Sequence, residues 1–212
     1  MIFERESTED EMVAGFLKGE VESRRFGERL QDCLVRFGVD SDLVSDPDLA
    51  DVDANAARAR VLGCYRGWKN ASDPYLFRDW ADNVTWTRER LEADDLPRVR
   101  YAKCDPWDAF SRFTYRVPIL AKRVKNGDQT LGSGKEIQAV RALVELMRAG
   151  ATFQPIVVLT DADRSTIALV EGHSRYTAHT IVGGAARTMP AFVATADPAA
   201  VEAWRFWPPR VS

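Results

Sequence analysis

The chain has 212 residues, of which 45% are hydrophobic and 29% are charged, and its net charge is −3 at pH 7. These proportions are ordinary for a globular protein with a substantial core, and the weak acidity argues against a protein that coats nucleic acid. No run of eighteen apolar residues is present, so we expect no membrane span. The acidic start, Met1–Glu6, lacks the layout of a signal peptide, and a cytoplasmic location is the expectation.

The cysteines and histidines are too few and too scattered to suggest a metal site. The three cysteines, Cys33, Cys64 and Cys104, have no CxxC spacing, and the chain has only two histidines. We therefore expect reduced, mostly buried thiols and no His/Cys metal cage.

Charge is distributed unevenly along the chain. Residues 1–55 hold 15 acidic and 6 basic side chains, a balance of −9, so the remaining residues sum to +6 within the net charge of −3. This asymmetry fits an anionic ligand bound by the C-terminal part. It equally fits two solvated surfaces, and charge alone does not decide between them.

The N-terminal region, residues 1–95, is expected to be mostly helical. Thr8 and Glu11 form a capping-box pattern, and apolar residues then recur at helical spacing. Three helices are predicted, at residues 8–21, 25–37 and 54–68, and Gly38 is a plausible end of the second.

A compact α/β unit is expected over residues 96–197, followed by an aromatic tail at 198–212. The pattern predicts a helix, a strand, a hairpin turn, a strand, a helix and a closing strand. These elements are expected at residues 134–149, 153–159, 161–164, 166–170, 173–182 and 189–194. The tail, with Trp204, Phe206 and Trp207, either covers a site or packs back on the domain.

The turn between the second strand and its helix is the candidate site. Gly172 permits a tight turn, and free N–H groups at the helix start favour an anion. Arg175 supplies donors suited to phosphate, and the hydroxyls of Ser174 and Thr177 lie nearby in sequence. Glu171, where the strand ends, is suited to act as a base or to hold a metal ion. The alternative is a purely structural role, in which the turn is a capped helix start with a surface arginine.

These segments together resemble the ParB/sulfiredoxin-like superfamily over residues 97–197. The residues that carry the resemblance are Gln154–Val158, Val170–Ala178 and Met189–Val193. In that superfamily a Gln-Pro-Ile strand precedes an acidic-Gly turn with a following arginine, and a Pro-x-x-Val strand closes the unit. The resemblance implies an α+β fold with a small mixed sheet, preceded here by the helical region.

The superfamily contains proteins of different function, so the fold alone does not give the activity. Sulfiredoxins carry a reactive cysteine where this chain has His173, and too few residues follow the last strand for the DNA-binding domain of partition proteins. The turn is closest to that of free-standing members that phosphorylate small hydroxyl compounds. A glycine-rich segment, Leu131–Glu136, lacks the first glycine and the Ser/Thr of a P-loop.

The resemblance therefore implies a nucleotide-binding protein, an ATP-type phosphotransferase acting on a small hydroxylated metabolite with Mg²⁺. Glu171 and His173 would be catalytic, and Glu171 would also hold the metal. The nucleotide, ATP or another, would be bound by Gly172, Ser174, Arg175, Tyr176 and Thr177. The alternative is a non-enzymatic, nucleotide-dependent regulatory module. A homodimer or a protein partner bound through the helical region stays open, and nucleic acid is disfavoured as a partner.

Overall fold

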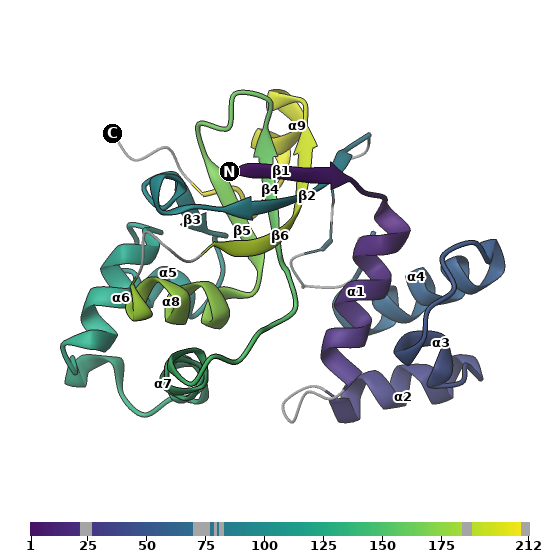
Figure 1. The fold of residues 1–212 in the computed structure, drawn as a ribbon, viewed down its shortest axis with the longest axis horizontal. Coiled ribbons are helices and arrows are strands. Elements are labelled where there is room, and N and C mark those ends of the chain that lie inside the picture. Colours follow the sequence, from purple (N-terminus) through teal and green to yellow (C-terminus); the bar gives the residue numbers. More distant parts are fainter. Residues whose placement is uncertain (22–26, 70–76, 79, 81–82, 184–187, 209–212) are drawn as a thin grey trace. The chain divides into compact units, whose positions relative to one another are not determined.

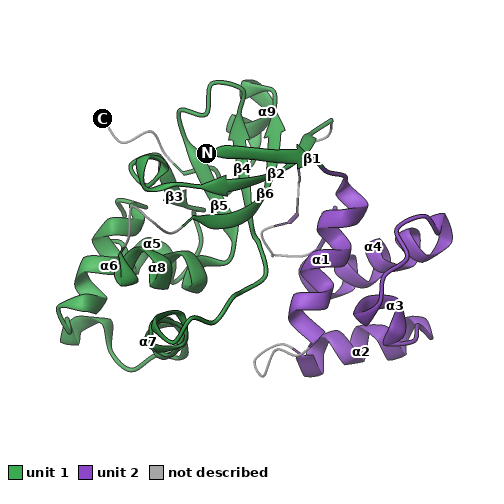
Figure 2. Ribbon diagram, in the orientation of Figure 1, with its two compact units in different colours: residues 1–6, 81–212 green, residues 7–80 purple. Residues whose placement is uncertain are grey.

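The computed structural model describes residues 1–21, 27–69, 77–78, 80, 83–183 and 188–208. The chain forms two compact units (Figure 2). Unit 1 comprises Met1–Glu6 and Ala81–Ser212, and unit 2 comprises Ser7–Trp80. Unit 1 therefore includes residues from both ends of the N-terminal region 1–95.

Unit 2 is built from helices in its described part. They are α1 (Glu9–Val21), α2 (Gly27–Phe37), α3 (Asp42–Ser45) and α4 (Val52–Arg66). The Glu11 N–H donates to the Thr8 hydroxyl oxygen at 3.1 Å, which places Thr8 at the start of α1 as its sequence pattern predicts. Gly38 has a φ of 61° directly after α2, the conformation expected of a helix-ending glycine. The three helices predicted from periodicity are present in the described residues, which do not include residues 25 and 26 at the predicted start of the second helix; α3 was not predicted.

Two cross-links join elements of unit 2. Cys33 of α2 and Cys64 of α4 form a disulfide, which corrects the expectation of reduced thiols; their spacing of 31 residues gave no motif to suggest the pairing. The second link is Arg58, which is only 1% exposed. Its guanidinium donates to the backbone oxygens of Leu43 and Asp48 at 3.1 and 2.6 Å and to the side chain of Asn55.

Unit 1 contains a six-stranded mixed sheet with helices around it (Figure 1). The strands are β1 (Ile2–Glu6), β2 (Thr85–Leu91), β3 (Val99–Tyr101), β4 (Ile156–Asp161), β5 (Ile167–Glu171) and β6 (Met189–Ala196). The α-helices are α5 (Trp107–Phe110), α6 (Val117–Lys125), α7 (Lys135–Arg148), α8 (His173–Val182) and α9 (Pro198–Ala203). Short 3₁₀ turns cover Ala93–Asp95 and Gln129–Leu131.

The strand order is β1-β2-β6-β4-β5-β3. Strands β4 and β6 are parallel, as are β3 and β5, whereas the other neighbouring pairs are antiparallel. The turn at 161–164 joins β4 and β5 as predicted, and Arg164 adopts a φ of 53° in it. Strands β1 and β2 lie in the stretch that the sequence pattern read as helical. Strand β1 is exposed throughout, and β2 carries the charged Glu89 at a buried position, so neither strand shows a clear apolar alternation.

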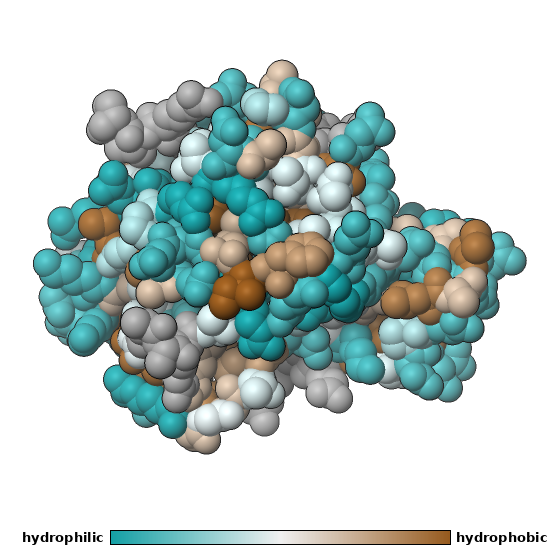
Figure 3. Space-filling view, turned by 45° about the horizontal axis from the view of Figure 1, so that its top comes forward, coloured by the Kyte–Doolittle hydropathy of each residue, from teal (hydrophilic) through white to brown (hydrophobic). Residues whose placement is uncertain are grey.

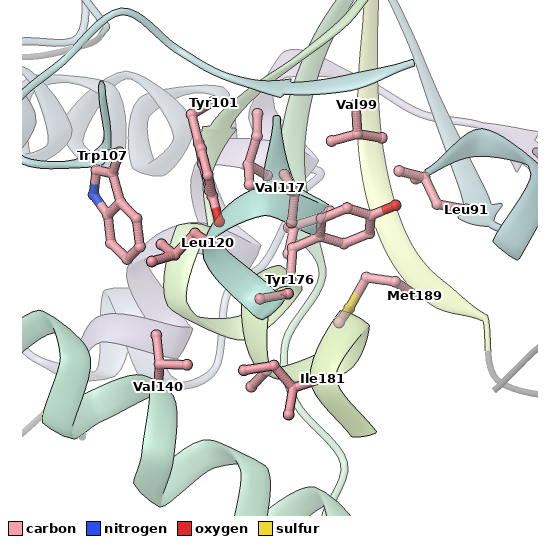
Figure 4. Packing of buried hydrophobic residues seen from close by; sticks show 14 of the residues in the cluster. Leu91, Val99, Tyr101, Trp107, Val117, Leu120, Val140, Tyr176, Ile181 and Met189 are labelled. Carbon is pink, nitrogen blue, oxygen red and sulfur yellow. The ribbon is translucent and has the colours of Figure 1, made fainter. Parts of the chain in front are cut away.

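The main core of unit 1 lies between the sheet and helices α6, α7 and α8 (Figure 4). Alternate residues of the central strands, among them Ile156, Val158 and Leu169, meet Leu120, Val140 and Ile181 of the helices. Strand β4 also contacts α9. The observed architecture is therefore α+β with a mixed sheet, and the expectation of that class is confirmed.

Across the part of the chain that the structure describes, none of the helices is both long and apolar enough to cross a membrane.

Candidate functional site

The turn between β5 and α8 depends on Gly172. Its φ is 93°, in the left-handed region that favours glycine, and it is the residue that caps α8. A Cβ built at this position would lie 2.3 Å from Cγ2 of Ile156. Two independent constraints, backbone conformation and contact with β4, therefore require a glycine here.

The N-terminal end of α8 has unused hydrogen-bond donors. The first helical bond runs from the Tyr176 N–H to the Gly172 oxygen at 2.8 Å, and no side chain caps the helix. Among the described residues, the backbone N–H groups of Ser174 and Arg175 have no acceptor. Because the helix dipole adds partial positive charge at this end, the turn is suited to an anion.

Arg175 connects the turn to the segment before β4. One guanidinium nitrogen donates to the backbone oxygens of Gln154 and Pro155, at 2.7 and 3.3 Å. The other forms an ion pair with the Glu171 carboxylate. The side chains of Arg175 and Glu171 are 17% and 21% exposed, so the pair lies at the surface edge of the turn. Arg175 therefore has a structural role in the absence of any ligand.

His173 lies inside the protein, with 8% of its surface exposed. Its ring stacks against Trp107 and Tyr101, with centroids 5.1 and 5.8 Å apart. Its Nε2 lies 3.9 Å from Sγ of Cys104. These contacts are typical of a packing residue, and they place the imidazole in an aromatic layer beneath the turn.

Cys104 is a residue of this site that the sequence did not indicate. It follows β3, which lies beside β5, and the parallel register brings it next to the start of α8. Burial, with Asp108 and Asp105 nearby, raises the pKa of the Cys104 thiol to about 12. A reactive cysteine needs a lowered pKa, so this thiol lacks the environment of a sulfiredoxin-type nucleophile.

Tyr176 and Thr177 face the interior. Tyr176 is 2% exposed, and burial raises the pKa of its hydroxyl. Thr177 is fully buried and donates to the His173 oxygen at 2.6 Å. Its oxygen lies 2.6 Å from the Tyr101 hydroxyl, which must then be the donor. In this arrangement Glu171, Ser174 and Arg175 are the partly exposed residues of the turn, Gly172 is buried against Ile156, and Tyr176 and Thr177 anchor the turn to the core.

The aromatic tail also reaches this region. The Lys103 N–H, adjacent to Cys104, donates to the Phe206 oxygen at 2.8 Å. Trp204 is 2% exposed, and Trp204 and Phe206 contact each other with ring centroids 5.6 Å apart. The described part of the tail is thus bonded to the loop after β3.

The donor set for a metal ion is small. Among the described residues, no group of three or more His, Cys, Asp or Glu side chains is placed to hold a metal. Glu171 is the carboxylate nearest the N-terminal end of α8 along the chain. Mg²⁺ commonly uses one or two carboxylates together with ligand phosphates and water, so Glu171 fits such an ion only with a phosphate ligand present.

The fold and the turn define a class: a mixed-sheet α+β unit with a glycine-dependent strand-to-helix turn that exposes helix N–H groups. A scan against protein-family models, and searches of curated proteins and of solved structures, returned no match to this chain.

Proposed function

We propose that unit 1 binds a phosphate-bearing ligand, a nucleotide, at the N-terminal end of α8. The observation that carries the proposal is the uncapped start of α8, with acceptor-free N–H groups at Ser174 and Arg175. Gly172 has no side chain to cover these groups. Phosphate is one of the anions that such a helix start binds.

The order of elements supports a ParB/sulfiredoxin-like fold for this unit. Helix α7 precedes β4, a hairpin leads to β5, and α8 connects β5 to β6. Strand β6 then pairs in parallel with β4. The motif residues Gln154 and Pro155, directly before β4, are the ones that accept hydrogen bonds from Arg175. The two parts of the motif are therefore in contact, as a shared role would require.

Phosphotransfer is a second candidate, and the Glu171–Arg175 ion pair favours it. A phosphate bound at the turn would compete with Glu171 for the guanidinium of Arg175. Glu171 would then be released to accept the proton of a substrate hydroxyl or to bind Mg²⁺. The buried, stacked His173 supports the aromatic layer in this scheme and transfers no proton. Without a hydroxyl acceptor the same site is a nucleotide-dependent regulatory module.

The binding proposal is tested by placing a fixed negative charge at the helix start. Ser174→Asp should stabilise α8 by about 0.5 kcal/mol, because an acidic side chain favours a helix N-terminus. It should also abolish binding, because the carboxylate repels phosphate and occupies the N–H groups. Nucleotides with and without Mg²⁺ are screened by thermal shift, since a ligand specific to the folded state raises its melting temperature.

Ser133→Asp is the matched control, because Ser133 is an exposed serine just before α7. It should leave the ligand-induced shift unchanged. A shift that persists in Ser174→Asp would place the ligand elsewhere, and no shift with any nucleotide would contradict the proposal. Transfer is tested separately: Glu171→Gln should keep nucleotide binding and lose phosphorylation of a hydroxyl acceptor.

A further inference from the structure

A basic hollow lies between α6, α7 and α8. It has a volume of about 180 Å³ and is lined by Val124 and Lys125 of α6, Arg141, Val144, Glu145 and Arg148 of α7, and Ile181 of α8. The valines and Ile181 form an apolar floor, each less than a tenth exposed. The cations and Glu145 form the rim.

Charge on this rim is incompletely compensated. Arg148 pairs with Glu145 at 2.8 Å. Lys125 and Arg141 are exposed and have no ion-pair or hydrogen-bond partner among the described residues. Helix α6 contains no acidic residue, and the Arg123 guanidinium in its last turn, which does not line the hollow, pairs with Asp128 after the helix. The hollow therefore presents positive charge around a small apolar floor.

The volume of the hollow limits the size of the group that can bind in it. Pockets for small molecules usually measure about 300–1,000 Å³, so this one is too small for a nucleotide. It is sufficient for one aliphatic side chain. A complementary surface would present an exposed aliphatic residue with carboxylates on either side of it.

Unit 2 carries a surface of this kind. In the segment Asp46–Asp53, Leu49 and Val52 are 43% and 77% exposed and alternate with aspartates. Asp48 and Asp51 accept hydrogen bonds from the backbone N–H groups of Ala50 and Ala54, at 2.9 and 3.0 Å, which fixes the local backbone. The side chains of Asp46 and Asp53 have no partner among the described residues. Figure 3 shows one face of the chain, on which hydrophobic side chains gather in several small patches between hydrophilic ones.

We infer that two copies of the chain associate through these surfaces, with the Asp46–Asp53 segment of one copy on the α6–α8 hollow of the other. Charge complementarity selects this occupant. Opposite charges on the rim and on the segment attract, while Leu49 or Val52 covers the apolar floor. Because each chain carries both surfaces, either copy can supply the hollow or the segment. The small size of the hollow makes this a weak, salt-sensitive dimer.

Sedimentation equilibrium of the full chain measures the association. At about 50 mM salt we expect a concentration-dependent dimer, and at about 500 mM salt an affinity at least about tenfold lower, because salt screens exposed charges. Arg141→Glu and Asp53→Lys should each weaken the dimer by about tenfold or more, because each places like charges together. Lys135→Glu is the matched control: Lys135 is exposed on the same helix as Arg141 and does not line the hollow.

A mixture of the two weakened variants gives the sharpest result. In the mixture, the altered hollow of Arg141→Glu can pair with the altered segment of Asp53→Lys, and the unaltered hollow can pair with the unaltered segment. The mixture should therefore associate at least about tenfold more tightly than either variant alone. A chain that stays monomeric at low salt, a dimer unaffected by either variant, or a mixture without recovery would overturn the inference.

Discussion

The two units of the chain are stabilised in different ways. Unit 1 packs three helices onto a six-stranded sheet. It contains close van der Waals contacts such as that between Gly172 and Ile156, and a buried Glu89 that pairs with Arg164. Unit 2 is smaller and has an apolar core of its own, but it adds the Cys33–Cys64 disulfide and the buried Arg58. Small units bury a lower fraction of their surface and gain more from cross-links.

This difference predicts different sensitivities. A single methyl group added where the backbone is in close contact with a side chain should lower the free energy of unfolding of unit 1. Loss of the disulfide should lower that of unit 2. The candidate site lies in unit 1, at a position where conformation and packing both restrict the sequence. The geometry of the candidate site should therefore depend on packing contacts, such as that of Gly172 with Ile156, as well as on the groups that would contact a ligand.

The largest expected effect is that of Gly172→Ala. The new Cβ would meet Ile156 at 2.3 Å and would also hold a side chain at a φ of 93°. Strain and overpacking together should lower the free energy of unfolding of unit 1 by about 4 kcal/mol. Urea denaturation followed by circular dichroism and tryptophan fluorescence measures this loss.

Gly150→Ala is the matched control for that variant. Gly150, after α7, has a φ of 89°, and an added Cβ there meets nothing within 4 Å. It should cost about 1 kcal/mol, from backbone strain alone. Equal losses in the two variants would mean that the contact with Ile156 does not restrict the turn.

The second largest effect concerns the disulfide. Replacing Cys33 and Cys64 by serine frees a loop of 31 residues in the unfolded chain. The free energy of unfolding of unit 2 should fall by about 3 kcal/mol, and that of unit 1 should not change. Thiol titration of the denatured wild-type protein should detect one thiol before reduction and three after it. Three thiols without reduction would contradict the pairing.

Much of the fold could be predicted because, in the longer elements, the spacing of apolar residues agrees with the glycines that end the helices. Helices α1, α7 and α8 have apolar stripes, and Gly38 and Gly150 mark helix ends by their positive φ. Strand β1 could not be predicted, because all five of its residues are exposed and carry no alternation. The disulfide depends on the packing of α2 against α4, which no local pattern encodes.

The sequence placed the candidate site at Glu171–Ala178, and the strand-to-helix turn expected there is present, because glycine and helix-start chemistry are local. Its surroundings were not predicted. Cys104 and Trp107 reach His173 only because β3 pairs in parallel with β5, a contact between segments about 70 residues apart in sequence. The same long-range contact explains why His173, polar in sequence, occupies an aromatic layer.

The smallest predicted effect is alkaline destabilisation of unit 1. Burial raises the pKa of the Cys104 thiol from its ordinary value of 9.0 to about 12, so the folded state keeps a proton that the unfolded state releases. The resulting stability is present below about pH 9 and is lost as the pH rises towards about 12. By pH 10 ionisation of this thiol should lower the free energy of unfolding by about 1 kcal/mol.

The disulfide-bonded cysteines of unit 2 do not titrate. Thermal unfolding between pH 8 and about pH 10 compares wild type with Cys104→Ala, and the decline should be shallower in the variant because it has no thiol to ionise. Identical slopes would place the Cys104 thiol in a water-like environment, and the aromatic layer beneath the turn would then be open to solvent.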